Sequence, residues 1–519
     1  MRKIEAAAAF KAKNHCHDSD KIKKAAIGGG TENKMKIKKL CAGVLVLAVS
    51  VSALFALAAC RNGDSPAETT PAVDETTTAV ETTEYLDGLN FNSAVRVLGW
   101  EAPRNEFYVD ELTEDRVNDS IYLRNKTVEE RIGVKFEFDL IKGDNPNKDF
   151  FVTQAEATVG SGACEYDVIG CYSMCSGIMA QRGLLCDLYT VDYLDMNRPW
   201  WPESLTRSSE INGKLYFATG DISNEFLYNL YFMLVNLDRL KELGLNDPRV
   251  MTENNTWTLD AMMEMCKRAY EDLNSSQKAD YGDKFGLVIF TQVHIDSFLA
   301  ASGVQMTRWD NNGNIVLSED FTGERMVNIV DKLGSWINGN NEIAYDTNDG
   351  YKTIKSGNAL FGTCAGSTVM GFRDIDWVYG ILPFPMIDKD SGGYHTNVGF
   401  AYTNFSVPQN APDKAMSGAA IEALAAESYT RTSPVLFEVV FKSVLSNDPL
   451  DARMYDIIKS NVYVDMARLY SGNFTWANSA VALFRNTVIS GEKSWRVKVK
   501  ANEAYINGVF AEISESFRR

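Results

Sequence analysis

The sequence predicts an α/β protein whose sheets are mostly parallel and covered by helices. Residues 94–188 show strand and helix patterns in the order β-α-β-α-β, which is typical of parallel strands joined by crossover helices. The chain has 519 residues, more than one ordinary core, so we expect two domains or one two-lobed unit. Its hydrophobic content of 45% and charged content of 23% are normal for a globular protein.

The elements of the first half follow from apolar patterns. Residues 94–100 and 166–172 are short apolar runs that predict strands, and residues 134–141 alternate as a strand does. Residues 119–133 carry a helical apolar face that ends at a glycine, and residues 150–159 are also helical in character. Together these segments give the alternating order on which the fold class rests.

The later elements are read in the same way. Residues 211–222 predict a hairpin-like pair around Asn212-Gly213. Residues 227–248 predict a strand and then a helix. The clearest helix lies within residues 256–273, where Thr258 can cap the first turn and Asp260 favours its positive end. The chain after residue 445 is predicted to be mainly helical.

The N-terminal segment predicts export. A short positive stretch from Met35 to Lys39 precedes an apolar run over residues 40–59, the layout of a secretory signal. The sequence Leu57-Ala-Ala-Cys60 resembles a bacterial lipobox, in which Cys60 is lipidated and becomes the first mature residue; an uncleaved signal anchor is the alternative. Residues 1–34 precede a signal with its own methionine, so we interpret them as a mis-called start and residues 1–59 as a leader.

A tether follows the lipidation site. Residues 60–88 are rich in Thr, Glu, Ala and Pro, a composition that buries too little apolar surface to fold. The folded chain is therefore expected to begin near Leu89. One acylated cysteine would anchor the protein to the membrane without spanning it, which predicts a location on the outer, extracellular face of the bacterial cytoplasmic membrane.

Charge and motifs exclude several classes of protein. A formal net charge of −17 argues against nucleic-acid binding, which needs a basic face. The sequence has neither a phosphate-binding glycine loop nor a G-x-S-x-G elbow, and no cofactor is expected. Residues 310–314 resemble a calcium loop, but Ile315 and Phe321 stand where glycine and glutamate are needed. A turn between two strands is the better interpretation.

Six cysteines follow the lipidation site. Two of them, Cys171 and Cys175, lack the second pair that a zinc site would need, so no metal is expected. An even number of cysteines in an exported protein permits disulfides, but buried free thiols are equally compatible with the sequence. The six are Cys164, Cys171, Cys175, Cys186, Cys266 and Cys364.

Aromatic residues are the most suggestive functional feature. The chain has 9 Trp, 22 Tyr and 26 Phe, and aromatic rings suit carbohydrate recognition because the C–H face of a sugar packs on them. The candidates are Trp100, Tyr172, Tyr228, Trp309, Trp377 and Trp476. Asp221 and Glu225 lie among aromatic residues and could form the acid pair of a glycosidase or simply accept hydrogen bonds from sugar hydroxyls.

Several segments in a characteristic order resemble a known family. These are "YDVIGCYS…MAQRGLLCDL", "INGKLYFATGD", "LYFMLVNLDRLKELGLNDP…TWTLDAMMEMCKRA", "KSGNALFGTCAG" and "YGILPFP". With the lipobox and the tether, they resemble the family-1, carbohydrate-type extracellular solute-binding proteins of ABC importers. Asn236 and Trp257 match the asparagine and tryptophan of the family pattern, whereas its usual proline is replaced at or near Thr219.

The resemblance implies a type II periplasmic-binding-protein fold, with two α/β lobes, a hinge and a ligand cleft between the lobes. Lobe 1 would comprise residues 89–220 and 395–445, and lobe 2 residues 221–394 and 446–519, with the first hinge crossing near residues 218–228. The partners would be a carbohydrate ligand and the permease subunits of an importer, with a monomeric, non-enzymatic binding protein as the carrier. The ligand-binding residues carried over are Trp100, Glu101, Tyr172, Ser173, Asp221, Glu225, Tyr228, Gly366, Ser367 and Trp377.

Three alternatives remain open at this point. The ligand could be a peptide or another polar solute. A surface glycoside hydrolase would turn its ligand over and would lose activity on replacement of Asp221 or Glu225. A structural or adhesive lipoprotein would bind no small ligand and show no lobe closure.

Overall fold

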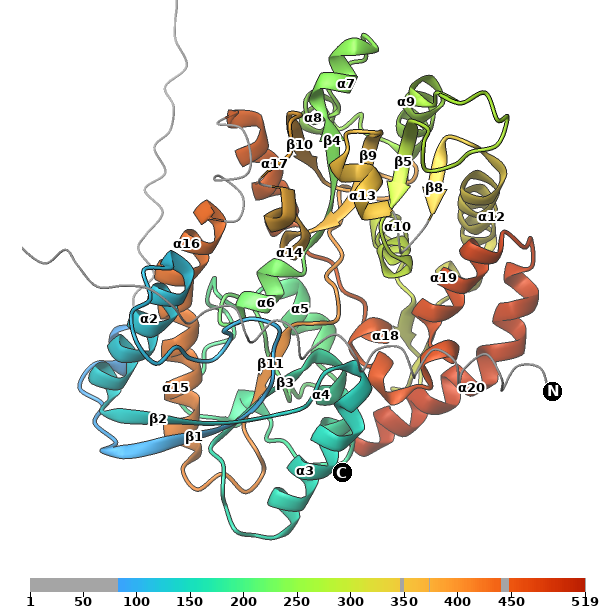
Figure 1. The fold of residues 1–519 in the computed structure, drawn as a ribbon. Coiled ribbons are helices and arrows are strands. Elements are labelled where there is room, and N and C mark those ends of the chain that lie inside the picture. The colour runs from blue at the N-terminus through green and yellow to red at the C-terminus, as the bar shows by residue number, and fades with distance from the viewer. Residues whose placement is uncertain (1–82, 346–349, 373, 440–447, 519) are drawn as a thin grey trace, which may run out of the picture. The chain divides into compact units, whose positions relative to one another are not determined.

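Two separate β-sheets organise this computed structural model, which describes residues 83–345, 350–372, 374–439 and 448–518 (Figure 1). The first sheet has the strand order β11-β3-β1-β2 and the second β10-β4-β9-β5-β8. The strands of the first sheet are β1 (Ser93–Trp100), β2 (Val134–Ile141), β3 (Val168–Tyr172) and β11 (Thr403–Ser406). Those of the second are β4 (Tyr231–Asn236), β5 (Phe285–Ile289), β8 (Ile343–Tyr345), β9 (Ala359–Ala365) and β10 (Tyr379–Leu382).

The first sheet is parallel except for its last strand. β1 pairs in parallel with β2 and β3, and β11 adds to β3 in antiparallel orientation. The helices α2 (Arg116–Ile132) and α15 (Lys414–Glu427) pack on each other and contact β2 and β1, whereas α3 (Lys148–Gly160) packs on α4 (Ser173–Gln181), which contacts β3 and β11. β3 is buried along its length, whereas β2, at the sheet edge, exposes alternate residues.

Two glycines let an aromatic ring lie flat against this sheet. A Cβ atom at Gly99 would lie 3.1 Å from the ring of Phe107 and one at Gly170 only 2.4 Å from it. Phe107 therefore packs directly on the backbone and contacts Phe405 edge-on, with ring centroids 5.9 Å apart. This packing anchors the middle of the loop that joins β1 to α2.

The second sheet is mixed. β5 pairs in parallel with β8 and β9, and β4 is antiparallel to both β9 and β10. A separate hairpin is formed by β6 (Thr307–Trp309) and β7 (Ile315–Leu317). The helices between α4 and β11 in the sequence are α5 (Glu203–Ser209), α6 (Asn224–Tyr228), α7 (Leu237–Glu242), α8 (Pro248–Glu253), α9 (Leu259–Ala269), α10 (Asp296–Ala301), α11 (Glu319–Thr322), α12 (Glu324–Gly339), α13 (Gly350–Lys355) and α14 (Gly366–Val369).

The C-terminal helices contact elements of both sheets. α17 packs on α8 and β10, α18 on α4 and α5, α19 on α12, and α20 on β7 and α12. A buried charge triad, in which Asp296 accepts hydrogen bonds from Arg468 (2.9 Å) and Arg485 (2.5 and 2.8 Å), ties α18 and α19 to α10. These last helices are α16 (Ser433–Phe437), α17 (Pro449–Ser460), α18 (Met466–Leu469), α19 (Ala480–Ser490) and α20 (Trp495–Ser516).

Within the described residues, two neighbouring chain segments run from one sheet to the other. The first passage, residues 218–231, leaves the first sheet where Ala218 pairs with Phe405 and enters β4. The second passage, residues 397–405, returns to β11, and the two passages pair with each other at Leu230 and Val398. The backbone N–H of Tyr231 donates to the carbonyl of Asn397 at 2.9 Å. Two lobes, each built on its own sheet, are thus joined by paired strands.

Most predicted elements are confirmed, and two details are corrected. Residues 211–222 do not form a hairpin: the predicted turn is present, with positive φ at both Asn212 and Gly213, but only Ile211 and Lys214 pair across it. The folded chain begins before Leu89, because Leu86 is fully buried and the Tyr85 hydroxyl donates to Glu422. One tyrosine and one leucine in a polar stretch give too weak a pattern to predict that contact.

The six cysteines that follow the predicted lipidation site all lie within the described residues. All six are free thiols, and only Cys164 is not buried. None of the helices within the described ranges is long and apolar enough to cross a membrane. The apolar run 40–59 and Cys60 lie outside the described residues.

Candidate functional site

The carboxyl ends of strands from both sheets meet the two passages. At the end of β3, Ser173 donates from its N–H to the carbonyl of Tyr402 at 2.9 Å and from its hydroxyl to that of Phe400 at 2.6 Å. At the end of β9, the N–H of Gly366 donates to the carbonyl of Leu230 at 3.3 Å. Ligands of open α/β sheets bind beyond such strand ends, so this junction is the candidate site.

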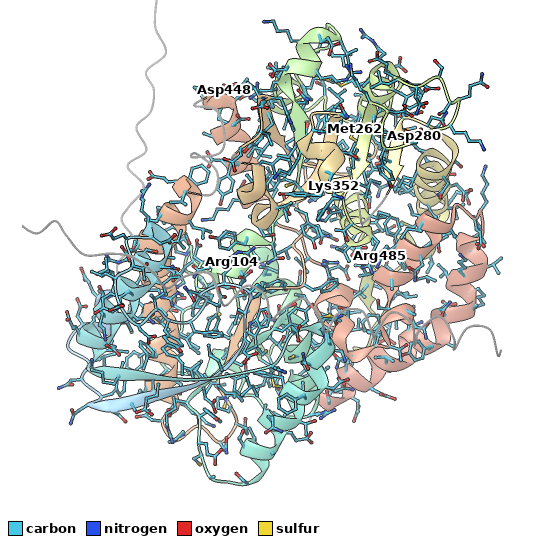
Figure 2. The ribbon with its side chains drawn as sticks, in the orientation of Figure 1. Arg104, Met262, Asp280, Lys352, Asp448 and Arg485 are labelled. Atoms are coloured by element: carbon cyan, nitrogen blue, oxygen red, sulfur yellow. The ribbon has the colours of Figure 1, made fainter. Side chains whose placement is uncertain are left out.

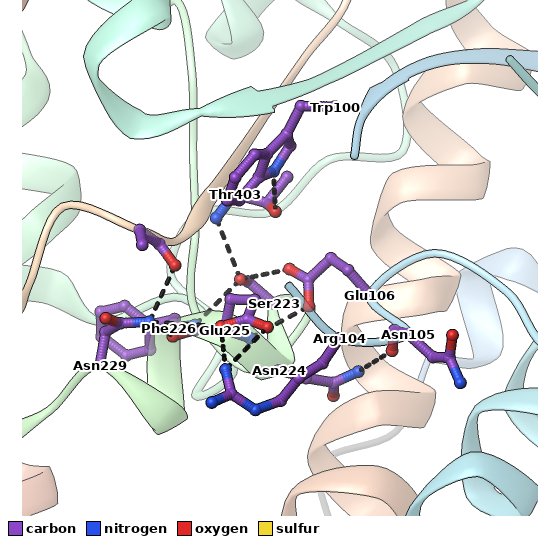
Figure 3. A network of polar contacts seen from close by, with 11 residues as sticks. Trp100, Arg104, Asn105, Glu106, Ser223, Asn224, Glu225, Phe226, Asn229 and Thr403 are labelled. Atoms are coloured by element: carbon purple, nitrogen blue, oxygen red, sulfur yellow. Dashed lines mark hydrogen bonds and ion pairs between the residues drawn. The ribbon is translucent and has the colours of Figure 1, made fainter. Parts of the chain in front are cut away.

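A network of polar contacts joins the loop after β1 to both passages (Figure 3). Glu106 accepts a hydrogen bond from the Ser223 hydroxyl at 2.5 Å and one from the N–H of Glu225 at 3.0 Å. The Ser223 oxygen in turn accepts from the N–H of Thr403 at 3.2 Å, and the Thr403 hydroxyl accepts from the Trp100 indole at 2.9 Å. The loop, the first passage and the second passage are therefore held as one unit.

Glu225 is the electrostatic centre of this network. Its side chain is fully buried and accepts hydrogen bonds from Nη1 of Arg104 at 2.8 and 3.1 Å and from the Asn229 amide at 3.3 Å. Burial and the nearby Glu106 raise the pKa of Glu225, Arg104 opposes both effects, and the resulting pKa is about 7. Burial also raises the pKa of Glu106 above its ordinary value.

Arg104 is the part of this network that is exposed to solvent. Its guanidinium lies 4.3 Å from the centre of the Tyr228 ring, a cation–π contact, and about one third of its side chain is exposed. Only Nη1 is used by Glu225, and within the described residues Nε and Nη2 make no hydrogen bond. That edge of the guanidinium is a preformed pair of donors. Arg104 is also one of the residues that line a hollow of about 430 Å³, formed by residues 101–110 and Leu140.

The second sheet contributes aromatic rings on its side of the junction. Phe290 directly follows β5, its N–H donates to the Thr363 hydroxyl at 2.9 Å, and its half-buried ring packs 5.5 Å from that of Tyr351. His294 is buried against Tyr231 with ring centroids 4.4 Å apart. Burial lowers the pKa of His294 to about 3, so its imidazole is neutral and bonds the same Thr363 hydroxyl at 2.9 Å.

The structure brings several predicted site residues to this junction, but many of them are covered. Trp100 and Tyr172 pack edge to face at 5.3 Å and are nearly fully buried, so they support the site as core residues. Asp221 is buried and accepts from Lys459 at 3.1 Å. Tyr228 lies beneath Arg104. Glu101 is exposed beside the hollow.

At the second sheet, Gly366 is buried and Ser367 is partly exposed at the start of α14. Trp377 is the predicted residue that lies elsewhere. It donates from Nε1 to the carbonyl of Lys355 at 2.9 Å, and Tyr379, two residues on, pairs with Asn236 at the opposite end of β4 from the passages.

Sequence reasoning missed Arg104, Glu106 and Phe290. Arg104 and Glu106 belong to a loop without periodicity, and their partners lie more than a hundred residues away in the chain. Phe290 could have been found, because it is the first residue after an apolar strand and is followed by polar Thr291 and Gln292.

Asp221 and Glu225 are not arranged as the acid pair of a glycosidase. A glycosidase needs two carboxyl groups that can reach the glycosidic bond, but Asp221 and Glu225 are buried and each is held by a cation. Among the residues described, no cluster of three or more His, Cys, Asp or Glu side chains could hold a metal ion. What the site does present is a donor edge on Arg104 and half-buried aromatic rings.

Comparison with solved structures identifies the fold. No protein-family model matches the sequence, and a comparison with curated proteins finds no relative. The chain is similar to the cyclic α-maltosyl-1,6-maltose binding protein from Arthrobacter globiformis, with a TM-score of 0.55, 16% identity, and coverage of 81% of this chain and 99% of that one. It is also similar to a cyclo/maltodextrin-binding protein complexed with maltotetraose, with a TM-score of 0.53, 13% identity, and coverage of 80% and 96%.

A third similar structure is a family 1 extracellular solute-binding protein from Bifidobacterium longum subsp. infantis. Its TM-score is 0.51 at 15% identity, and the match covers 80% of this chain and 99% of that one. At such identities the likeness concerns the fold. The predicted type II periplasmic-binding-protein fold with two α/β lobes is confirmed, and so is the resemblance to the family-1 solute-binding proteins at the level of the fold.

Proposed function

We propose that this protein is the substrate-binding component of an ABC importer and captures a sugar or oligosaccharide between its two lobes. The observation that carries the proposal is the prepared donor edge of Arg104 at the junction of the two lobes, on a fold shared with proteins described as binders of maltodextrins and cyclic maltosides. Two N–H groups held in one plane match a pair of neighbouring sugar hydroxyls. Half-buried rings such as Phe290 would supply the apolar contact that the face of a sugar needs.

The mechanism we infer is ligand-dependent closure. A ligand that contacts Arg104 from the first lobe and Phe290 or Ser367 from the second would bind the closed arrangement better than an open one. It would therefore shift the equilibrium toward closure. The closed protein would then deliver its ligand to the permease subunits.

The anchoring part of the proposal rests on the sequence alone. Lipidation of Cys60 would hold the protein at the outer face of the cytoplasmic membrane, with the Thr-rich segment that follows it as the tether. The test is to express the chain with and without Cys60→Ser and to measure membrane association and the mass of the N-terminal peptide. Acylation absent from the wild-type peptide would overturn this part.

The binding proposal is tested by thermal unfolding of the whole chain with a panel of oligosaccharides. Any detergent used to keep the whole chain in solution must carry no sugar headgroup, because the headgroup of a maltoside could compete with the oligosaccharides for the site. A ligand that binds only the folded state raises the melting temperature by mass action, so a shift without turnover supports the proposal. Turnover would favour a hydrolase, a shift with peptides alone would favour a peptide importer, and no shift with any ligand would overturn transport.

A conservative variant locates the site. Arg104→Lys keeps a cation beside Glu225 but removes the planar donor edge, so we expect affinity for the bound sugar to fall about tenfold. Arg116→Lys is the matched control, since Arg116 pairs with Glu438 on the surface and is 61% exposed. Equal affinity in the two variants would place the ligand away from Arg104.

A further inference from the structure

Trp309 is exposed, whereas most of the tryptophans whose side chains the structure describes are buried. Six of the tryptophans that the structure describes are at most 2% exposed, whereas the side chain of Trp309 is 42% exposed. The six buried ones are Trp100, Trp200, Trp201, Trp257, Trp336 and Trp495. Leaving so large an apolar side chain in water forgoes the free energy of its burial. An exposed tryptophan of this kind therefore calls for a functional explanation.

The hairpin that carries Trp309 is held rigidly. Trp309 pairs with Ile315 across the turn, and the Asp310 carboxylate accepts from the N–H groups of Asn312 and Asn314, both at 2.8 Å. Nη2 of Arg518 donates to the carbonyls of Asn312 and Gly313, both at 2.7 Å, and to the Asn314 side chain at 2.9 Å.

The other strand of the hairpin is fixed to the last helix. The N–H of Ile315 donates to the Ser514 hydroxyl at 3.0 Å, and that of Leu317 donates to the Asn507 side chain at 2.8 Å. Because the hairpin is held in place by these contacts, the Trp309 ring loses little conformational freedom when it binds a ligand, which favours affinity.

The ring borders a groove with uncommitted polar groups. The groove has a volume of about 300 Å³, and its lining includes Trp309, Tyr463, Gln305, Thr307 and Ser208. Within the described part of the chain, the Trp309 indole N–H, the Gln305 amide and the Ser208 hydroxyl make no hydrogen bond. Two aromatic rings beside three free polar groups form the combination that holds a sugar ring.

The two charged side chains that line the groove already have partners. Arg308 pairs with Glu319 at 2.7 Å, and the Asp465 carboxylate accepts from the N–H groups of Met306 and Ala467, both at 2.8 Å, and from the Thr307 hydroxyl at 3.1 Å. Because both side chains are already engaged within the protein, the expected occupant of the groove is neutral.

We propose that this groove is a second carbohydrate site, which holds a neutral pyranose unit of a longer glycan stacked on Trp309. It is built from residues other than those around Arg104 and does not depend on the proposed transport function. Its effect would be to retain the protein on a polysaccharide from which smaller saccharides are released.

The test is electrophoresis of the whole chain in native gels that contain a neutral polysaccharide. Amylopectin, glucomannan and xylan are used in turn with a sugar-free detergent, and the acidic chain migrates toward the anode. We expect at least one polysaccharide to retard the wild type, and Trp309→Ala to weaken that interaction about tenfold or more. Trp309→Phe should retain part of it, and Gln305→Ala should weaken it less than Trp309→Ala.

Two controls separate this site from the one at Arg104. Trp309→Ala should leave oligosaccharide-induced thermal stabilisation unchanged, whereas Arg104→Lys should leave gel retardation unchanged. Absence of retardation with all three polysaccharides overturns the second site, as does retardation that survives Trp309→Ala or is lost in Arg104→Lys. Failure of the thermal-shift screen with retardation intact would count against transport and not against this groove.

Discussion

Glu225→Gln should abolish a pH dependence of folding stability that one buried carboxyl group creates. The pKa of Glu225 is raised from 4.5 to about 7 in the folded protein, so the folded state retains a proton that the unfolded chain releases. Stability from this group is therefore full below pH 4.5 and is lost as the pH rises through 7. Linkage with these two pKa values gives a loss of about 2.5 kcal/mol between pH 5 and pH 8.

The assay is guanidinium unfolding of the wild type and Glu225→Gln at pH 5 and pH 8, followed by tryptophan fluorescence. The glutamine variant should lose less stability than the wild type over this interval, and the two losses should differ by about 2.5 kcal/mol. Glu101→Gln, in the same loop but exposed, serves as the matched control and should behave as wild type. Equal pH dependence in wild type and Glu225→Gln would refute the reasoning. Because Glu106 contributes to the shift, Glu106→Gln should move the midpoint of the loss to lower pH.

Two further predictions concern packing and buried charge, and both are read from guanidinium unfolding. Asp296→Asn should destabilise the fold by about 3 kcal/mol or more, because it leaves the two arginines of the buried charge triad without their counter-charge. Gly170→Ala should cost about 1–3 kcal/mol, since the new Cβ would lie 2.4 Å from the Phe107 ring. Gly508→Ala is its control: nothing lies within 4 Å of a Cβ there, so this helical site should gain about 0.5–1 kcal/mol.

Local patterns predicted the elements well because their causes are local. The alternation over residues 134–141 gives β2 with the same bounds, since an edge strand exposes every second residue. Thr258 caps α9 as expected and accepts from the N–H of Ala261. Strand pairings that depend on tertiary packing could not be predicted from local patterns. Strand β11 joins β3 from more than two hundred residues away in the chain, and no periodicity carries that information.

The sequence could indicate which segments form the candidate site, but not which of their side chains are exposed in it. The family resemblance implied Tyr172, Ser173 and Gly366, and the structure places these residues at strand ends beside the two passages. Aromatic type alone, however, cannot tell a binding surface from a core residue. Trp100 is buried against Tyr172, and its indole N–H donates to Thr403. Trp309, with the same side chain, is exposed on a hairpin.

The network around Ser223 also constrains how the two lobes can move. Its hydroxyl oxygen connects Glu106 in the loop after β1, Phe226 in the first passage and Thr403 in the second. Through these contacts and the stacking of Arg104 on Tyr228, we infer that both residues move as one block with the first sheet. Figure 2 marks the place of Arg104 in the fold, and Figure 3 shows the network around it. Bending is therefore expected beyond this block, where the passages enter the second sheet. On closure, Phe290 and Ser367 would move toward a donor edge on Arg104 that is already fixed, so the cost of ordering that arginine is met by folding and not by ligand binding.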